Sequence, residues 1–382
     1  MIEQILSLPI EKKIGQLFFI GLPGTEVNAE TRELLDEVSP GGVCLFARNI
    51  RRAEQTRKLL DDLREALQVE PFLSLDQEGG LVDRLRRVTT PMPSARVIRQ
   101  HGDLAAARQL GKITGEILRL LGFNMNFAPT MEIMSEEREL LSNGLFSRSF
   151  GRSPGEVLGY SMVYLRGLQS QGIVGCLKHF PGIGAGEVDS HEELPLVHLT
   201  HDELIAQDLA PYIELFLFRR DEDDRVRAVM VSHGGFPKID LEQHVMGGKL
   251  IPASLNKNIV TTLLREELGF KHLCMTDDLE MGAITRHCPI EEAAVSAFEA
   301  GEDMILICST VESVRKSYHA MLEAFENGKF TEERLNASLL RIVELKTKLQ
   351  PPLDFNPERL KELSDVISRL NQTLNYTYGG KI

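Results

Sequence analysis

Eight short apolar runs recur along the chain, and between them lie longer stretches whose apolar residues have helical spacing. The apolar runs are Phe18–Gly21, Gly42–Phe46, Phe72–Asp76, Asn124–Ala128, Val174–His179, Ala228–His233, Leu273–Asp277 and Asp303–Ile307. The helical stretches include Ala53–Leu67, Leu104–Leu121, Glu156–Gln171, Asn256–Leu268, Ile290–Ala300 and Val311–Asn327. Strands that alternate with helices predict parallel βα units.

Eight such units fit a single α/β domain of the (β/α)8 TIM-barrel type, although a doubly wound open sheet shows the same alternation. We expect the barrel, over residues 1–350, because chains of this length form barrels as one domain. The remaining residues, 351–382, are predicted to form a C-terminal helical extension that packs on the barrel or trails from it.

The charge and the cysteines restrict the partners and the compartment. A formal net charge of -13 opposes binding to nucleic acid, because that affinity comes largely from Lys and Arg on phosphates. The apolar run at Leu17–Leu22 is short and follows no basic leader, so we expect neither a membrane segment nor export. The five cysteines lack CxxC spacing, which indicates reduced thiols in a cytoplasmic protein.

Polar residues end four of the predicted strands. They are Asp76, Lys178 with His179, Ser232 with His233, and Asp277. In a barrel these strand ends meet at one face, where active sites form. Any single strand can also end in a polar residue because it leaves the core there, but four ionisable strand ends together favour a site.

The segment from Lys178 to Pro195, KHFPGIGAGEVDSHEELP, predicts a long loop at the barrel mouth, because its proline and glycines oppose a helix. Asp189 and His191 are separated by one residue, which allows the carboxylate to orient the imidazole for proton transfer. The same residues are also compatible with a zinc site or with a plain surface loop.

Two further stretches carry acids at strand ends. Asp277 and Asp278 in TDDLEM could ligate magnesium, cap the following helix or supply a nucleophile. In DQEGGLVDR, Asp76 and Arg84 could hold sugar hydroxyls or form a structural ion pair.

Together the motifs resemble glycoside hydrolase family 3, and within it the single-domain, NagZ-type β-N-acetylglucosaminidases. The resemblance rests on DQEGG at Asp76, NFAP at Asn126, SRSFG at Ser147, KHFPG at Lys178, DSH at Asp189 and TDDLEM at Thr276. It implies a retaining exo-glycosidase that removes terminal β-linked N-acetylglucosamine, typically from muropeptide fragments in cell-wall recycling. It also implies no cofactor and no metal, and a monomer is favoured.

The resemblance assigns roles residue by residue. Asp277 matches the nucleophile, His191 the acid/base, and Asp189 the residue that orients it. The positions that bind the terminal sugar match Asp76, Arg84, Arg148, Lys178 and His179.

Two positions depart from the family pattern. Ile183 replaces the second histidine of KHFPGHG, and Leu81 replaces a frequent arginine after DQEGG. Phosphorolysis competes with hydrolysis, because a neutral histidine repels phosphate less than a carboxylate does. A non-catalytic sugar-binding barrel and a metal-dependent hydrolase built on His179, Asp189 and His191 are also compatible with the chain, whereas a β-glucosidase or β-xylosidase is disfavoured by the DSH loop.

Overall fold

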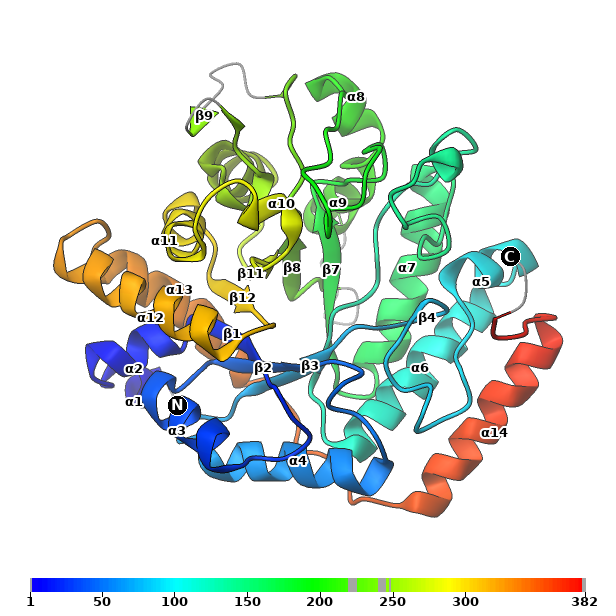
Figure 1. Cartoon of the computed structure of the whole chain (residues 1–382). Helices are drawn as coiled ribbons and strands as arrows, with labels where there is room; N and C mark the ends of the chain where they lie inside the picture. The colour runs from blue at the N-terminus through cyan, green and yellow to red at the C-terminus, as the bar shows by residue number, and fades with distance from the viewer. Residues whose placement is uncertain (1, 219–224, 240–244, 247–248, 380–382) are drawn as a thin grey trace.

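A computed structural model describes residues 2–218, 225–239, 245–246 and 249–379. Its central feature is an eight-stranded parallel sheet in the order β3-β2-β1-β12-β11-β8-β7-β6 (Figure 1). The strands are β1 (Phe18–Gly21), β2 (Gly42–Leu45), β3 (Phe72–Leu75), β6 (Met125–Asn126), β7 (Val174–Phe180), β8 (Ala228–Val231), β11 (Leu273–Asp278) and β12 (Met304–Ile307).

The sheet closes between its two edge strands. The amide of Asn124 donates to Leu73 O at 3.1 Å, and the amide of Phe127 donates to Leu75 O at 3.0 Å. The predicted barrel is therefore confirmed, and the open-sheet alternative is wrong. All eight predicted strands are present, with ends within a few residues of those expected.

Helices surround the barrel and bury their apolar faces against it (Figure 1). The longer ones are α3 (Ala29–Val38), α4 (Ala53–Ala66), α6 (Leu104–Leu121), α7 (Pro154–Gln169), α11 (Ile290–Ala300), α12 (Val311–Glu326), α13 (Glu332–Lys346) and α14 (Pro357–Thr373). The helix expected over 256–268 is a π-helical segment, η5 (Asn258–Glu267). Residues of the barrel strands are almost all buried, because one side meets the barrel interior and the other meets the helices.

Shorter elements fill the connections. They are α1 (Ile2–Leu6), α2 (Ile10–Gly15), α5 (Ala95–His101), η1 (Arg138–Leu140), α8 (His201–Ala206), α9 (Ala210–Ile213), η2 (Glu214–Phe218), η4 (Ala253–Leu255) and α10 (Gly282–Thr285). Two small antiparallel hairpins pair β4 (Gln77–Gly79) with β5 (Val82–Asp83), and β9 (Val245–Met246) with β10 (Lys249–Leu250). The β4–β5 hairpin matters for function, because it follows β3 directly at the mouth of the barrel.

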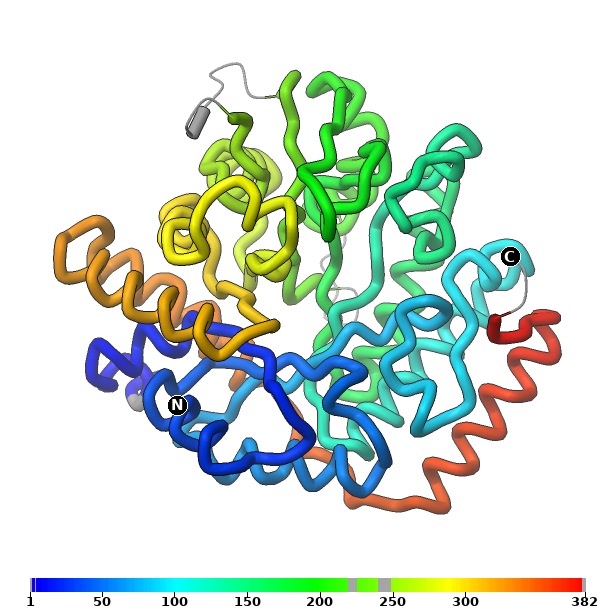
Figure 2. The backbone as a smooth tube through the Cα atoms, viewed as in Figure 1, coloured from blue at the N-terminus to red at the C-terminus, as the bar shows by residue number. Residues whose placement is uncertain are grey.

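The C-terminal helix α14 runs back along the outside of the barrel beside α6 (Figure 2). Its residues Leu360, Leu363, Ile367 and Leu370 are buried in the main core cluster. Asn371 Nδ2 donates to Pro91 O at 2.9 Å, and Ser364 Oγ lies 3.0 Å from Thr90 Oγ1. The helix thus contributes to the same core as the barrel helices.

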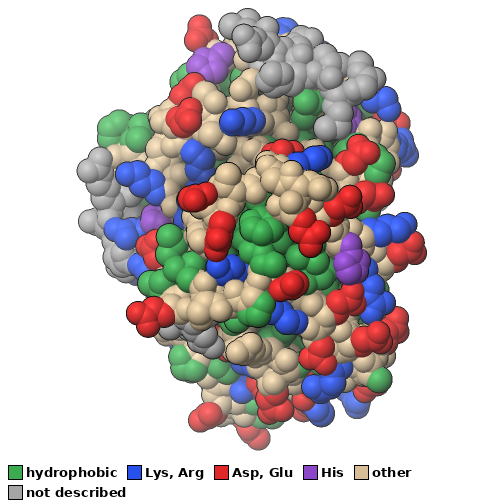
Figure 3. Space-filling model, turned by 90° about the vertical axis from the view of Figure 1, so that its left-hand side faces the viewer, with side chains coloured by type: hydrophobic (Ala, Val, Ile, Leu, Met, Phe, Trp, Pro, Cys, Tyr) green, Lys and Arg blue, Asp and Glu red, His purple; other side chains and the backbone are tan. Residues whose placement is uncertain are grey.

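The surface is mixed in charge. Lys and Arg side chains lie among Asp and Glu side chains over the face shown in Figure 3. Within the described residues, every helix is too short or too polar to cross a membrane. All five cysteines are free and buried.

Candidate active site

A cavity of about 330 Å³ opens at the C-terminal ends of the barrel strands. Seven of the eight residues predicted for the site line it: Asp76, Arg84, Arg148, Lys178, His179, His191 and Asp277. The eighth, Asp189, lies behind His191 and binds it. The ends of β3, β7 and β11 supply four of these residues, because inward side chains at the ends of alternate strands meet over the barrel axis.

A cluster of two cations and two carboxylates forms one wall. The Lys178 ammonium lies 2.5 Å from Asp76 Oδ1 and 2.7 Å from Glu78 Oε1. Arg148 binds Glu78 with two parallel hydrogen bonds of 2.8 and 2.9 Å. Burial alone would raise the pKa of Glu78, but Arg148 and Lys178 hold that pKa well below its usual range. Glu78 is therefore ionised between two cations, and all four residues of the cluster line the cavity.

Arg84 completes this wall more loosely. Its Nη2 atom lies 3.7 Å from Asp76 Oδ2, and its guanidinium lies 5.8 Å from the centroid of the Phe46 ring. The pair is too long for a hydrogen bond, so both partners keep polar atoms for another ligand.

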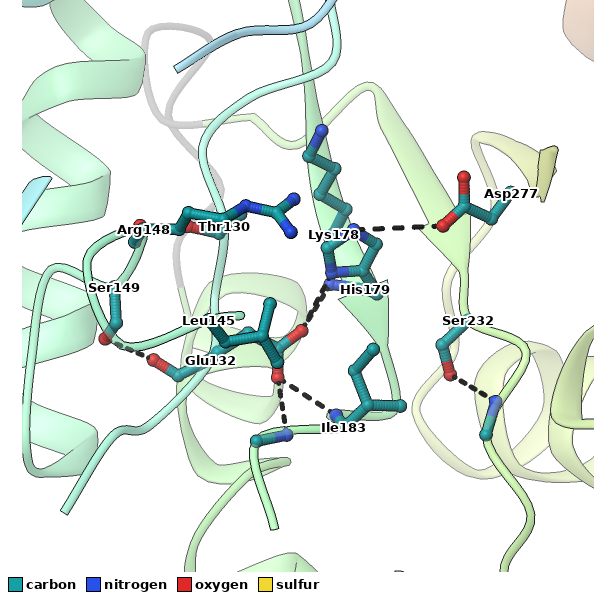
Figure 4. Close-up of polar contacts among 12 residues, drawn as sticks. Thr130, Glu132, Leu145, Arg148, Ser149, Lys178, His179, Ile183, Ser232 and Asp277 are labelled. Carbon is teal, nitrogen blue, oxygen red and sulfur yellow. Dashed lines mark hydrogen bonds and ion pairs between the residues drawn. The ribbon is translucent and has the colours of Figure 1, made fainter. Parts of the chain in front are cut away.

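Asp277 lies at the end of β11, opposite His179 (Figure 4). Its Oδ2 atom lies 3.9 Å from His179 Nε2, and its Oδ1 atom accepts a 2.8 Å bond from the amide of Asp278. Burial acts to raise the pKa of Asp277, but the nearby His179, His233 and Lys178 lower that pKa below its usual value. The side chain is thus an ionised carboxylate with one oxygen directed into the cavity region.

Asp189 and His191 lie on the long loop that follows β7, as predicted. Asp189 Oδ1 accepts from the amide of His191 at 2.9 Å and lies 2.7 Å from His191 Nδ1. An ionised carboxylate only accepts, so Nδ1 carries a hydrogen and Nε2 is the nitrogen free to exchange a proton. The His191 side chain is 68% exposed, which leaves this nitrogen open to a ligand and to water.

The loop is fastened to the segment after β11. The amide of Gly282 donates to His191 O at 3.1 Å, and the amide of Ala283 donates to Ser190 O at 3.2 Å. A Cβ atom on Gly282 would lie 2.4 Å from Glu192 O and 2.6 Å from His191 O. Only glycine fits here without displacing the loop that carries His191.

Two further polar residues at strand ends have structural partners, although Asp278 also lines the cavity. Asp278 Oδ1 accepts from the amides of Glu280 at 3.1 Å and Cys308 at 3.2 Å, so this acid stabilises the turn after β11. His233 is buried between Ser254 Oγ at 2.8 Å and Asp278 O at 2.9 Å. His233 thus contacts the backbone of the residue that follows Asp277.

Sequence reasoning missed the role of two buried acids. Glu78 was visible in DQEGG, but nothing local indicated that it binds Arg148 from 70 positions away. Glu132 binds the ring and the amide of His179, and no motif pointed to it. A charged residue inside the apolar stretch Met131–Met134 was the available signal.

The two departures from the family pattern lie in different surroundings. Ile183 is buried, with its methyl group close to Gly234 and Phe236, so it packs the base of the loop into an apolar cluster. Leu81 is 56% exposed at the tip of the β4–β5 hairpin, next to the cavity residue Val82.

The residues of the metal-site hypothesis are already bound to other partners. His179 binds Glu132, whereas Asp189 and His191 bind each other. Within the described ranges, no group of three or more His, Cys, Asp and Glu side chains is arranged to hold a metal ion.

An ionised aspartate and a carboxylate-oriented histidine thus border one cavity at the mouth of a closed (β/α)8 barrel, an arrangement compatible with a barrel glycoside hydrolase. Comparison with known proteins supports this class. The glycosyl hydrolase family 3 N terminal domain matches residues 9–345. The chain therefore belongs to glycoside hydrolase family 3, and the resemblance seen in its motifs is confirmed.

The relatives agree with this assignment. Beta-hexosaminidase A of Pseudoalteromonas piscicida is 33% identical over 85% of this chain, which spans 56% of that relative. Beta-hexosaminidase of Idiomarina loihiensis is 29% identical, and the match covers 84% of this chain and 92% of the relative. A solved family 3 beta-N-acetylglucosaminidase from Paenibacillus sp. str. FPU-7 superposes with a TM-score of 0.84 at 33% identity, covering 95% of this chain and 69% of its own.

Proposed function

We propose that this protein is a retaining exo-glycosidase that hydrolyses terminal β-linked N-acetylglucosamine. The names of its relatives support the sugar, and the carboxylate–histidine arrangement supports the mechanism. The observation that carries the proposal is the pairing of Asp189 with His191 at 2.7 Å beside a cavity that also holds Asp277.

In the first step, Asp277 attacks the anomeric carbon and forms a covalent glycosyl-enzyme. His191 Nε2 gives its proton to the departing oxygen, so the aglycone leaves as a neutral alcohol. In the second step, neutral His191 takes a proton from water, which attacks the same carbon from the face that the aglycone left. Asp277 then departs as a carboxylate, and two inversions give net retention.

Asp189 supports both steps by keeping the His191 ring in one tautomer and stabilising its charged form. The cavity wall, through Asp76, Arg84, Arg148 and Lys178, binds the hydroxyls of the terminal sugar together with His179. This wall carries charged donors and acceptors in fixed positions, which suits a ligand that is polar on every carbon.

The first test is turnover of p-nitrophenyl β-N-acetylglucosaminide compared with the corresponding glucoside. We expect hydrolysis of the acetamido sugar, its loss in Asp277→Ala and a strong reduction in His191→Ala. A mechanism-based fluorosugar should add one sugar mass to the protein, and peptide mapping should place that adduct on Asp277. A sugar phosphate formed in phosphate buffer would instead reassign the enzyme as a phosphorylase.

The natural substrate is proposed to be a muropeptide fragment, released in the cytoplasm during cell-wall recycling, and the protein is proposed to act as a monomer. A synthetic N-acetylglucosaminyl-anhydromuramyl peptide should then be cleaved with a higher kcat/KM than a chitin disaccharide. Equal or lower kcat/KM would point to chitin fragments, and light scattering measures the oligomeric state.

A further inference from the structure

Glu132 is a buried acid in contact with two parts of the site, and none of the proposed catalytic steps uses it. It lies between β6 and β7, where Thr130 pairs with Lys178, and its residue is 1% exposed. Figure 4 shows its carboxylate between the ring of His179 and the backbone at Ile183.

Each oxygen of this carboxylate has its own pair of donors. Oε1 accepts from the amide of His179 at 3.0 Å and lies 2.9 Å from its Nδ1 atom. Oε2 accepts from the amides of Ile183 at 2.9 Å and Gly184 at 3.0 Å. Burial acts to raise the pKa of Glu132, but these hydrogen bonds, led by the one from His179, lower that pKa below its usual value. Glu132 is therefore ionised and accepts from all four partners.

The first consequence concerns the His179 ring. Because an ionised carboxylate accepts only, Nδ1 must carry a hydrogen in both charge states of the imidazole. Any change of protonation is then confined to Nε2, which faces Asp277 at 3.9 Å. In the neutral ring, the nitrogen that faces Asp277 can therefore accept a hydrogen bond from a sugar hydroxyl. The opposite tautomer would place a donor there instead.

The second consequence concerns the loop that carries His191. Ile183 and Gly184 are its first residues after Pro181 and Gly182, and Glu132 holds both of their amides. From the other side, Asn143 Nδ2 donates to Gly184 O at 3.1 Å and to Gly186 O at 2.8 Å. Hydrogen bonds from both sides thus fix the base of the loop, and Glu132 Oε2 accepts two of them.

We propose that Glu132 is a positioning residue that fixes the tautomer of His179 and the base of the His191 loop through a single carboxylate. Glu132 does not itself touch the substrate. The effect of Glu132 on catalysis rests on the proposed function, but the tautomer of His179 can be measured without any substrate.

Glu132→Gln tests the proposal directly. Glutamine has one acceptor oxygen for these donors. On the loop side both donors are backbone amides, whereas on the His179 side the ring nitrogen Nδ1 can change from donor to acceptor. We therefore expect the oxygen to stay with the loop amides and the NH2 group to face His179, where the His179 amide loses its acceptor and the ring hydrogen moves to Nε2. Asp208→Asn is the matched control, because Asp208 is equally buried below the loop but binds Arg138, at 2.7 and 2.9 Å, instead of His179.

The tautomer is read from ¹⁵N–¹H correlation spectra of histidine-labelled protein at pH 8, with the His179 signals assigned by their loss in His179→Asn. We expect hydrogen on Nδ1 in the wild type and in Asp208→Asn, but on Nε2 in Glu132→Gln. We expect kcat/KM for p-nitrophenyl β-N-acetylglucosaminide to fall on the order of 10²-fold in Glu132→Gln, the upper range for removal of a residue that orients a functional histidine from outside the site. Asp208→Asn should lower the melting temperature but keep kcat/KM close to the wild-type value.

Glu132→Asp covers the case in which the glutamine variant does not fold. It keeps the charge, so it should keep hydrogen on Nδ1 and recover part of kcat/KM. The proposal is overturned if Glu132→Gln leaves hydrogen on Nδ1, if Asp208→Asn loses as much kcat/KM, or if a folded Glu132→Asp has hydrogen on Nε2. Absence of wild-type turnover would refute the proposed function instead, and the spectra would still decide the role of Glu132.

Discussion

The contact between Gly282 and the His191 loop leads to a prediction that tests leaving-group protonation by His191. In Gly282→Ala the new Cβ atom would meet Glu192 O at 2.4 Å and His191 O at 2.6 Å, where ordinary contacts begin at 3.4 Å. Both contacts are with backbone, so the loop must retreat by about 1 Å. A displacement of about 1 Å in a catalytic group costs on the order of 10²-fold in rate.

The loss should depend on the leaving group. Protonation by His191 matters for an alcohol of high pKa, whereas a dinitrophenolate leaves without it. For Gly282→Ala we therefore expect kcat/KM to fall about 10²-fold on an N-acetylglucosamine disaccharide and to change little on the 2,4-dinitrophenyl glycoside. His191→Ala should show the same selectivity, only larger.

Gly155→Ala is the control, because a Cβ atom on this helical glycine would have no other atom within 4 Å, and the variant should match the wild type. Melting curves exclude a general loss of folding. An equal loss on both substrates, or no loss on the disaccharide, would refute the idea that Gly282 acts through the position of His191.

Two further predictions concern buried charges. Glu78→Gln removes the negative charge that Arg148 and Lys178 share, and their side chains are 15% and 2% exposed. We expect the free energy of unfolding, measured by denaturant titration, to fall by about 3 kcal/mol and KM to rise. Burial lowers the pKa of Lys346 to about 7 in the folded protein. Between that pH and about 10, Lys346 is therefore protonated in the unfolded chain but neutral in the folded one. The free energy of unfolding then rises with pH by about 1.4 kcal/mol per pH unit. Lys346→Met has no group that titrates at this position, so its stability should lack this rise with pH. We expect the variant to melt at a higher temperature than the wild type at pH 7 and the difference to shrink by pH 10. A difference in melting temperature that does not change with pH would contradict the reasoning.

Local pattern was sufficient for the elements of this fold. The strand Phe18–Gly21 and the helices Leu104–Leu121 and Ile290–Ala300 have the predicted bounds, because apolar spacing and terminal glycines act within a few residues. The Asp189–His191 pair was also predictable, since one intervening residue places both side chains on one loop.

Other features depended on contacts that sequence spacing does not encode. The binding of Arg148 to Glu78 spans 70 positions, and that of Glu132 to His179 spans 47. The π-helical form of Asn258–Glu267 was not predicted either, because its apolar pattern also fits an ordinary helix.

The sequence by itself therefore determined the alternation of strands and helices, the family and the identity of the ionisable strand ends. The tertiary structure alone decided which of those ends meet and which buried acid each cation or imidazole binds. The physical reason is closure of the sheet between β3 and β6, which brings the ends of β3, β7 and β11 to one cavity. Charges buried there must find partners across the barrel, whatever their distance along the chain.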